Sequence, residues 1–169
     1  MTTFVALLRA VNVGGTGKLA MADLKQLCAS CGFTDVQTYI ASGNVVFDTA
    51  LPEAAVKSAL EAALAAHVGT SMPVMVRSAD EIAAVRDANP FPDANPSRTV
   101  AIFLDAPPPA DSLESLVAPD GEQVMLGARE IFIAYGESMG RSKLRLPAAA
   151  GGTARNMNTV AKLAAMAAR

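Results

Sequence analysis

Hydrophobic and polar residues follow two periods along the chain. TTFVALLR, MPVMVRS and SRTVAIFL have the apolar runs of strands, and DVQTYIASGNVVFDT and EQVMLGAREIFIAYG each predict a hairpin. Apolar residues three and four apart predict helices in MADLKQLCASCGF, EAAVKSALEAALAAHV, ADEIAAVRDA and TARNMNTVAKLAAMAA, with a shorter one in PADSLESLV. The sequence therefore predicts the order β-α-β-β-α twice, near residues 2–66 and 98–168.

Hairpins next to helices favour an α+β fold of ferredoxin-like character, with a mainly antiparallel sheet, over a doubly wound parallel sheet. The first hairpin is expected to turn at Ser42-Gly43-Asn44, because Gly and Asn tolerate a positive φ. The 169 residues are about half hydrophobic, which suits a single compact domain over 1–169 with possible halves 1–77 and 78–169.

Charge is distributed unevenly along the chain. Residues 1–22 carry a net charge of +2 and residues 138–169 a net charge of +6, and neither segment contains an acid. Because the whole chain has a net charge of −2, the middle of the chain carries −10. If the fold brought the two ends together, they would form one positive surface that attracts an anion. The other interpretation is a chance pattern with a basic tail.

The start of the chain lacks a basic leader and has Arg9 where a signal peptide would be apolar, and no stretch has the length of a membrane span. These features predict a soluble cytoplasmic protein with no membrane partner. The net charge of −2 also argues against a polycation that seeks nucleic acid.

The segment NVGGTGKLAM has the composition of a phosphate-binding loop. It fails the Walker pattern, because Asn12 stands where the first Gly is needed and Leu19 where a hydroxyl is needed. It meets GxGxxG/A at Gly15, Gly17 and Ala20, but the next strand enters a hairpin rather than a βαβ unit. Two interpretations stay open: an ordinary connection, or a non-standard loop whose glycines and Lys18 approach an anion.

The two cysteines and the single histidine are not predicted to have a catalytic or metal-binding role. Cys28 and Cys31 have CxxC spacing, but they fall at a helix end that disfavours a thiolate, and no second cysteine pair completes a zinc site. Two reduced thiols are expected. His67 is the only histidine and has no Ser, Cys or acid cluster near it in sequence, so no metal site and no role for His67 are predicted.

The predicted last helix begins with an unusual number of polar residues. Thr153 is expected to cap it, and Arg155, Asn156, Asn158 and Thr159 would then lie in its first turns, where free N–H groups and the helix dipole favour anions. A polar, solvent-facing first turn is the alternative.

Three segments together resemble one family: LLRAVNVGG at Leu7–Gly15, TYIASGNVVF at Thr38–Phe47 and TARNMNTVAKL at Thr153–Leu163. The chain is similar over essentially its full length to the uncharacterised family called domain of unknown function 1697. The resemblance implies an α+β, ferredoxin-like fold and no established reaction. Ala10 stands where the family usually has Gly and Met157 where it usually has Trp, which argues against aromatic stacking at that place.

The leading functional hypothesis is a binding module for a phosphate-bearing small molecule or nucleotide, with Arg9, Lys18 and Arg155 contacting the anion. No particular cofactor is indicated. The predicted ligand-binding residues are Arg9, Asn12, Gly14, Gly15, Lys18, Ser42, Asn44, Thr153, Arg155, Asn156, Asn158 and Thr159.

Three alternatives remain. Single-stranded nucleic acid could stack on Tyr39 and Phe47, which lie on predicted hairpin strands. An enzyme acting on a phosphorylated metabolite would need a general base, and only a carboxylate such as Asp23 or Asp48 could supply it. A protein-interaction module is the third.

Overall fold

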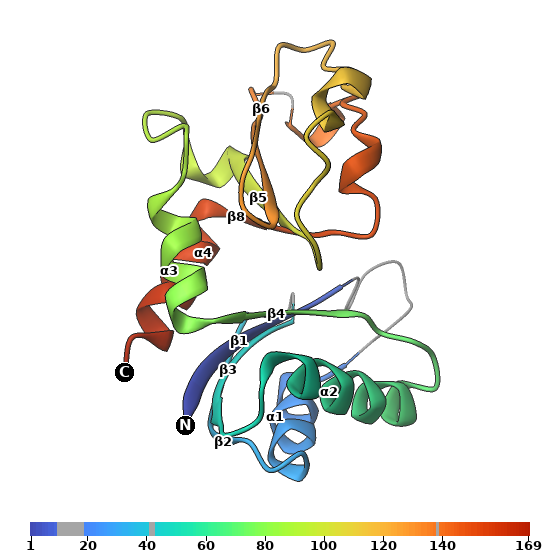
Figure 1. The fold of residues 1–169 in the computed structure, drawn as a ribbon, viewed down its shortest axis with the longest axis vertical. Helices are drawn as coiled ribbons and strands as arrows, with labels where there is room; N and C mark the ends of the chain where they lie inside the picture. The colour runs from blue at the N-terminus through green and yellow to red at the C-terminus, as the bar shows by residue number, and fades with distance from the viewer. Residues whose placement is uncertain (10–18, 41–42, 138) are drawn as a thin grey trace. The chain divides into compact units, whose positions relative to one another are not determined.

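The structure, a computed structural model, describes residues 1–9, 19–40, 43–137 and 139–169 (Figure 1). The chain divides into two compact units. The first consists of Met1–Ile82 together with Leu163–Arg169, and the second consists of Ala83–Lys162. Both ends of the chain therefore belong to the first unit.

The described part of the first unit has a four-stranded sheet with two helices between its strands. In chain order the elements are β1 (Thr2–Leu8), α1 (Met21–Ser30), β2 (Thr34–Tyr39), β3 (Asn44–Thr49), α2 (Glu53–Val68) and β4 (Val74–Ser78). The strand order is β2-β3-β1-β4 and all neighbours are antiparallel. This βαββαβ arrangement confirms the α+β, ferredoxin-like prediction.

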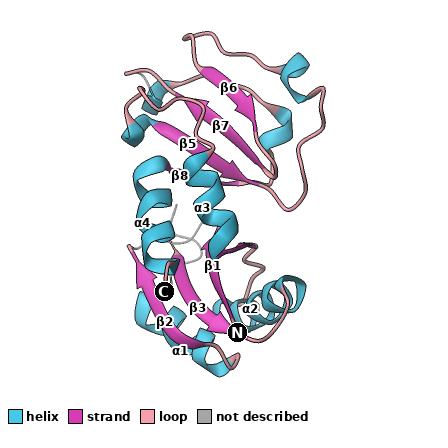
Figure 2. Ribbon diagram, turned by 60° about the vertical axis from the view of Figure 1, so that its left-hand side comes forward, coloured by secondary structure: helices cyan, strands magenta, loops and turns pink. Residues whose placement is uncertain are grey.

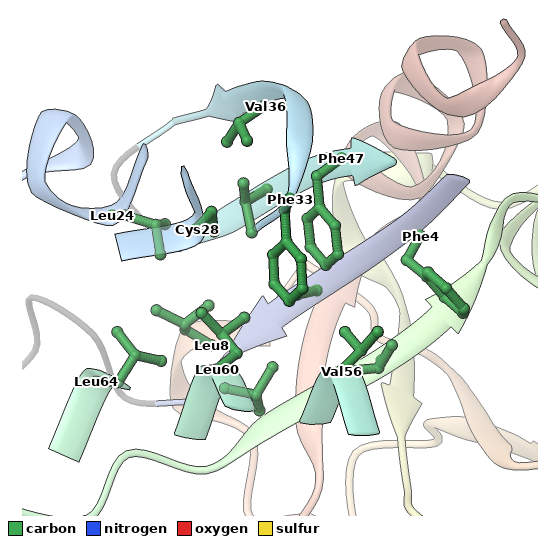
Figure 3. Close-up of a cluster of buried hydrophobic side chains, with 14 of the residues drawn as sticks. Phe4, Leu8, Leu24, Cys28, Phe33, Val36, Phe47, Val56, Leu60 and Leu64 are labelled. Atoms are coloured by element: carbon green, nitrogen blue, oxygen red, sulfur yellow. The ribbon is translucent and has the colours of Figure 1, made fainter. Parts of the chain in front are cut away.

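β1 is buried on both faces, which explains its continuous apolar run. Phe4 and Leu8 pack with α1 and α2 in one core (Figure 3), and Figure 2 shows both helices on the same face of the sheet. Val5 and Leu7 alternate with these residues and are fully buried on the opposite face. Hydrophobic burial from two sides therefore fixes β1 at the centre of the sheet.

The second unit repeats the strand order with different connections. Its strands are β5 (Thr99–Phe103), β6 (Gln123–Leu126), β7 (Glu130–Ala134) and β8 (Thr153–Asn156), in the antiparallel order β6-β7-β5-β8. Short 3-10 turns lie between them: η1 (Pro96–Arg98) precedes β5, and η2 (Ser112–Ser115), η3 (Met139–Arg141) and η4 (Pro147–Ala149) follow. The predicted short helix in PADSLESLV is thus only the turn η2.

Each fourth strand continues directly into a helix. β4 leads into α3 (Ala79–Asp87), and β8 leads into α4 (Met157–Ala167). Arg77 and Arg155 occupy the same position, one residue before the strand end, and each donates from Nη1 to the preceding carbonyl, at 3.0 and 2.9 Å. The predicted order β-α-β-β-α occurs in the first unit as β1-α1-β2-β3-α2, and what both units share is four strands followed by a helix.

The predicted start of the last helix at Thr153 is wrong. Residues Thr153–Asn156 form β8, which pairs with Val100–Phe103 of β5. α4 begins only at Met157, and Asn156 caps it, because its Oδ1 accepts the Thr159 amide at 2.9 Å. The ladder to β5 satisfies the backbone of these four residues, and Thr153 and Asn156 are weak helix formers that lose little by leaving the helix.

The prediction of a positive φ at Asn44 is also wrong. Gly43 has a φ of 87°, as expected, and the other positive φ in the described part of this connection is 49° at Ile40. Asn44 is instead the first residue of β3, and its buried side chain bonds across the hairpin. Ser42 lies outside the described residues.

Candidate functional site

The first two motif segments meet where β1 ends. Leu7 pairs with Asn44, and the Leu8 amide donates to the Gly43 carbonyl at 2.8 Å. The next amide, that of Arg9, donates to the Pro73 carbonyl at 3.0 Å, and the Arg9 side chain is exposed. The strand pairing therefore brings the start of LLRAVNVGG beside TYIASGNVVF and presents a cation at the same end of the sheet.

Asn44 is fully buried at this end. Its Nδ2 donates to the Tyr39 carbonyl at 2.9 Å, across the hairpin from its own strand. A buried amide that loses such a partner costs about 1 to 3 kcal/mol, so this bond fixes the backbone of the connection. The observed contacts of Asn44 thus suit it to positioning neighbouring residues rather than to touching a ligand.

The third motif segment crosses from β8 into α4 in the second unit. Arg155 pairs with Ala101 and is partly buried, and desolvation lowers its pKa to about 10. It therefore remains a cation at neutral pH. Asn158 is exposed, and its Nδ2 donates to Ser97 Oγ at 3.1 Å.

The first turns of α3 and α4 differ in charge. In α3 the Glu81 amide donates to Ser78 Oγ at 3.2 Å and the Ser78 amide donates to Glu81 Oε1 at 2.9 Å, which is a capping box. α4 has no acid in its first turn, and only Asn156 separates its first residue from Arg155. Because helix N-termini favour negative charge, α4 offers an anion a more positive end than α3 does.

The remaining predicted ligand residues fall into two groups. Thr153 and Thr159 are buried, and Thr153 Oγ1 has no hydrogen-bond partner among the described residues. The other five lie outside the described residues: Asn12, Gly14, Gly15, Lys18 and Ser42.

Sequence reasoning missed a pairing of Asp23 with His67. Asp23 is in the first turn of α1 and His67 in the last turn of α2, and His67 Nε2 lies 3.8 Å from Asp23 Oδ2. α1 starts after β1, and α2 ends before β4, which begins opposite Leu8. Both side chains therefore lie at the end of the unit where β1 finishes. Only the packing of α1 on α2, which no local pattern reveals, brings them together.

The surroundings of Cys28, Asp48 and Phe47 argue against a chemical role for these residues. Burial, and secondarily the Cys31 charge, raises the pKa of Cys28 to about 12, which disfavours a reactive thiolate. Burial raises the pKa of Asp48, but a hydrogen bond from Thr3 and the charge of Arg169 outweigh it and lower the pKa overall, so Asp48 is a poor general base. Phe47 is fully buried, which removes it as a stacking platform for bases.

Within the described ranges, no group of three or more His, Cys, Asp or Glu residues is placed to hold a metal ion. No helix in the same ranges is long and apolar enough to cross a bilayer.

The fold defines an α+β protein with two antiparallel, ferredoxin-like sheets. Residues 1–132 match the family described as "Protein of unknown function (DUF1697)", and the chain belongs to this family. The first two motif segments lie within the matched residues and the third lies beyond them. A solved structure, "The structure of conserved bacterial protein SP0830 from Streptococcus pneumoniae", is similar with a TM-score of 0.80 and 27% identity, and the match covers 98% of each chain. No curated protein matches the sequence.

Proposed function

We propose that this protein binds a phosphate-bearing small molecule or nucleotide at the end of the first unit where β1 finishes. The observation that carries the proposal is the pairing of Leu7 and Leu8, which begin the first motif segment, with Asn44 and Gly43 of the second, beside the exposed cation of Arg9. Backbone amides near glycines can approach an anion closely, and an arginine can bond two phosphate oxygens at once. Lys18, in the glycine-rich segment, supplies the second cation of this proposed site.

The second unit carries a separate group of proposed ligand residues. Arg155 supplies a cation two residues before the start of α4, and the first turn of that helix has no acid that would repel a phosphate. Asn156 is occupied as a cap, so we assign direct contact to Arg155 and Asn158 and leave Asn156 a positioning role.

The test is calorimetric titration of the intact chain with a panel of nucleotides and sugar phosphates. Arg9→Ala is expected to weaken binding of the ligand found by about 1.5 to 3 kcal/mol, the scale of a lost charge-assisted hydrogen bond, and Arg155→Ala tests the cation of the second unit separately. Arg86→Ala is the matched control, because Arg86 is exposed and pairs with its neighbour Asp87. Equal binding by Arg9→Ala, Arg86→Ala and the parent would refute the site proposed in the first unit.

One observation favours an enzyme as the second candidate. The pair of His67 and Asp23 lies at the same end of the unit, and a carboxylate beside an imidazole can support it as a general base. The reaction would be hydrolysis or transfer of a phosphoryl group. Product analysis on the same titrated ligand separates the two functions: turnover that His67→Asn removes without loss of binding supports the enzyme, and an unchanged ligand supports the binding module.

A further inference from the structure

Ile40 combines an unfavourable backbone with an exposed apolar side chain. Its φ of 49° lies in the left-handed region, where a β-branched residue is a steric outlier, and half of its surface is exposed. Neither feature helps the folded state: a glycine or asparagine would fit the backbone better, and an exposed isoleucine leaves apolar area in water.

The surrounding contacts hold this conformation in place. Directly before Ile40, the Tyr39 carbonyl accepts a hydrogen bond from the buried amide of Asn44. Gly43, on the other side of the connection, has a φ of 87°, and its carbonyl accepts a hydrogen bond from the Leu8 amide. Strained residues that their surroundings hold in this way are typical of ligand sites.

Strand register places Ile40 at the same end of the sheet as Arg9. Tyr39 pairs with Asn44, and Asn44 pairs with Leu7, so these three residues form one row across β2, β3 and β1. β2 and β1 run in the same direction, since both are antiparallel to β3. Ile40 and Arg9 therefore leave the sheet at the same end, from strands β2 and β1, which are two interstrand spacings or about 10 Å apart.

We infer that Ile40 is a specificity-determining residue that packs against the base of a nucleotide whose phosphate is held near Arg9. This inference rests on the proposed function and narrows its ligand class. An isoleucine side chain cannot donate or accept hydrogen bonds, so it gains little from sugar hydroxyls, whereas the face of a base offers apolar area to cover. A ligand that consists of phosphate alone would not reach Ile40.

The test compares two probes that share a diphosphate, ADP and inorganic pyrophosphate, in calorimetric titrations. Ile40→Asn introduces a residue that tolerates a positive φ and removes the apolar side chain. We expect the Kd for ADP to rise about fivefold, the effect of losing roughly half an isoleucine's burial, with no change for pyrophosphate and with an equal or higher Tm. Met125→Asn is the matched control, because Met125 is also 50% exposed and lies on β6 of the second unit.

The outcomes separate this inference from the proposed function. If the unaltered protein binds neither probe, the proposed function fails. If it binds pyrophosphate but not ADP, or if Ile40→Asn weakens ADP no more than Met125→Asn does, the phosphate site stands and the inference is overturned. Equal weakening of both probes would also overturn it, because Ile40 would then act by shaping the backbone. A lower Tm for Ile40→Asn would refute the argument from strain.

Discussion

Glu122 is a buried carboxylate in the second unit, and its two oxygens differ in hydrogen bonding. Its Oε1 accepts the Ser142 hydroxyl at 2.9 Å, while its buried Oε2 has no hydrogen-bond partner among the described residues. Tyr135 lies within reach of this charge: burial raises the pKa of its phenol, and the negative charge of Glu122 raises it further. The two residues therefore form an electrostatic pair that can be measured directly.

We predict that Glu122→Gln lowers the pKa of Tyr135 toward its ordinary value, because a nearby negative charge disfavours the phenolate. Burial keeps that pKa somewhat raised. The chain has two tyrosines and no tryptophan, so a Tyr39→Phe background leaves Tyr135 as the single phenol in a near-ultraviolet pH titration. Ser142→Ala is the control, since it removes the hydrogen bond and keeps the charge. An unchanged titration in Glu122→Gln would contradict the pairing.

For single residues, the sequence predicted which positions belong to the candidate site better than it predicted the role of each residue. Arg9 is exposed at the end of β1, in accord with a ligand-contact prediction that stays untested. The φ of Ile40 could not be predicted, because it depends on the long-range bond of Asn44 to the Tyr39 carbonyl. The pairing of His67 with Asp23 depends in the same way on helix packing.

Among the elements, segments with a clear apolar pattern were predicted well, including the short strands β4 and β5, whereas β8 and the turn η2 were predicted as helix. EAAVKSALEAALAAHV forms α2 over the predicted residues, because sixteen residues of Ala-rich amphipathic pattern leave no competing structure. β8 has only four residues and no apolar alternation, so its identity as a strand comes entirely from its partner β5. No propensity within TARN reveals a partner fifty residues earlier.

The boundary between β8 and α4 yields a stability prediction. Asn156→Ala removes the side chain that accepts the Thr159 amide, which is expected to cost about 1 kcal/mol and to lower the Tm by about 2 to 4 °C. Asn156→Asp keeps an acceptor and is expected to retain the stability. Lys162→Ala, at an exposed position of the same helix, serves as the control in the same thermal scans. If Asn156→Ala and Lys162→Ala melted alike, the cap would be refuted.

For the molecule as a whole, the uneven charge along the sequence has a partly structural explanation. The basic C-terminal segment and the acidic middle meet inside the first unit, where Arg169 Nη1 lies 3.0 Å from Asp48 Oδ2. Arg169 Nη2 also donates to the Asp35 carbonyl at 2.7 Å. The expectation that the two basic ends form a single positive surface stays untested, but Arg169 neutralises an acid and is not free to attract an anion.

The last residue should therefore stabilise the first unit, in a manner that depends on pH. Arg169→Ala removes a partly buried ion pair and is expected to cost about 1 kcal/mol at neutral pH. Because the pKa of Asp48 is lowered in the folded state, this contribution is present above the unfolded pKa of about 3.8 and is lost as the pH falls through the folded value. Urea unfolding of the parent and of Arg169→Ala at neutral pH and near pH 3 measures this contribution as the difference between their free energies of unfolding. Asp48→Asn should reduce the effect of Arg169→Ala to the part that comes from the hydrogen bond to the Asp35 carbonyl. Hydrogen exchange in β1 and β3, rather than in β5, should rise in Arg169→Ala. A loss of stability that is the same at both pH values would contradict the ion pair as its source.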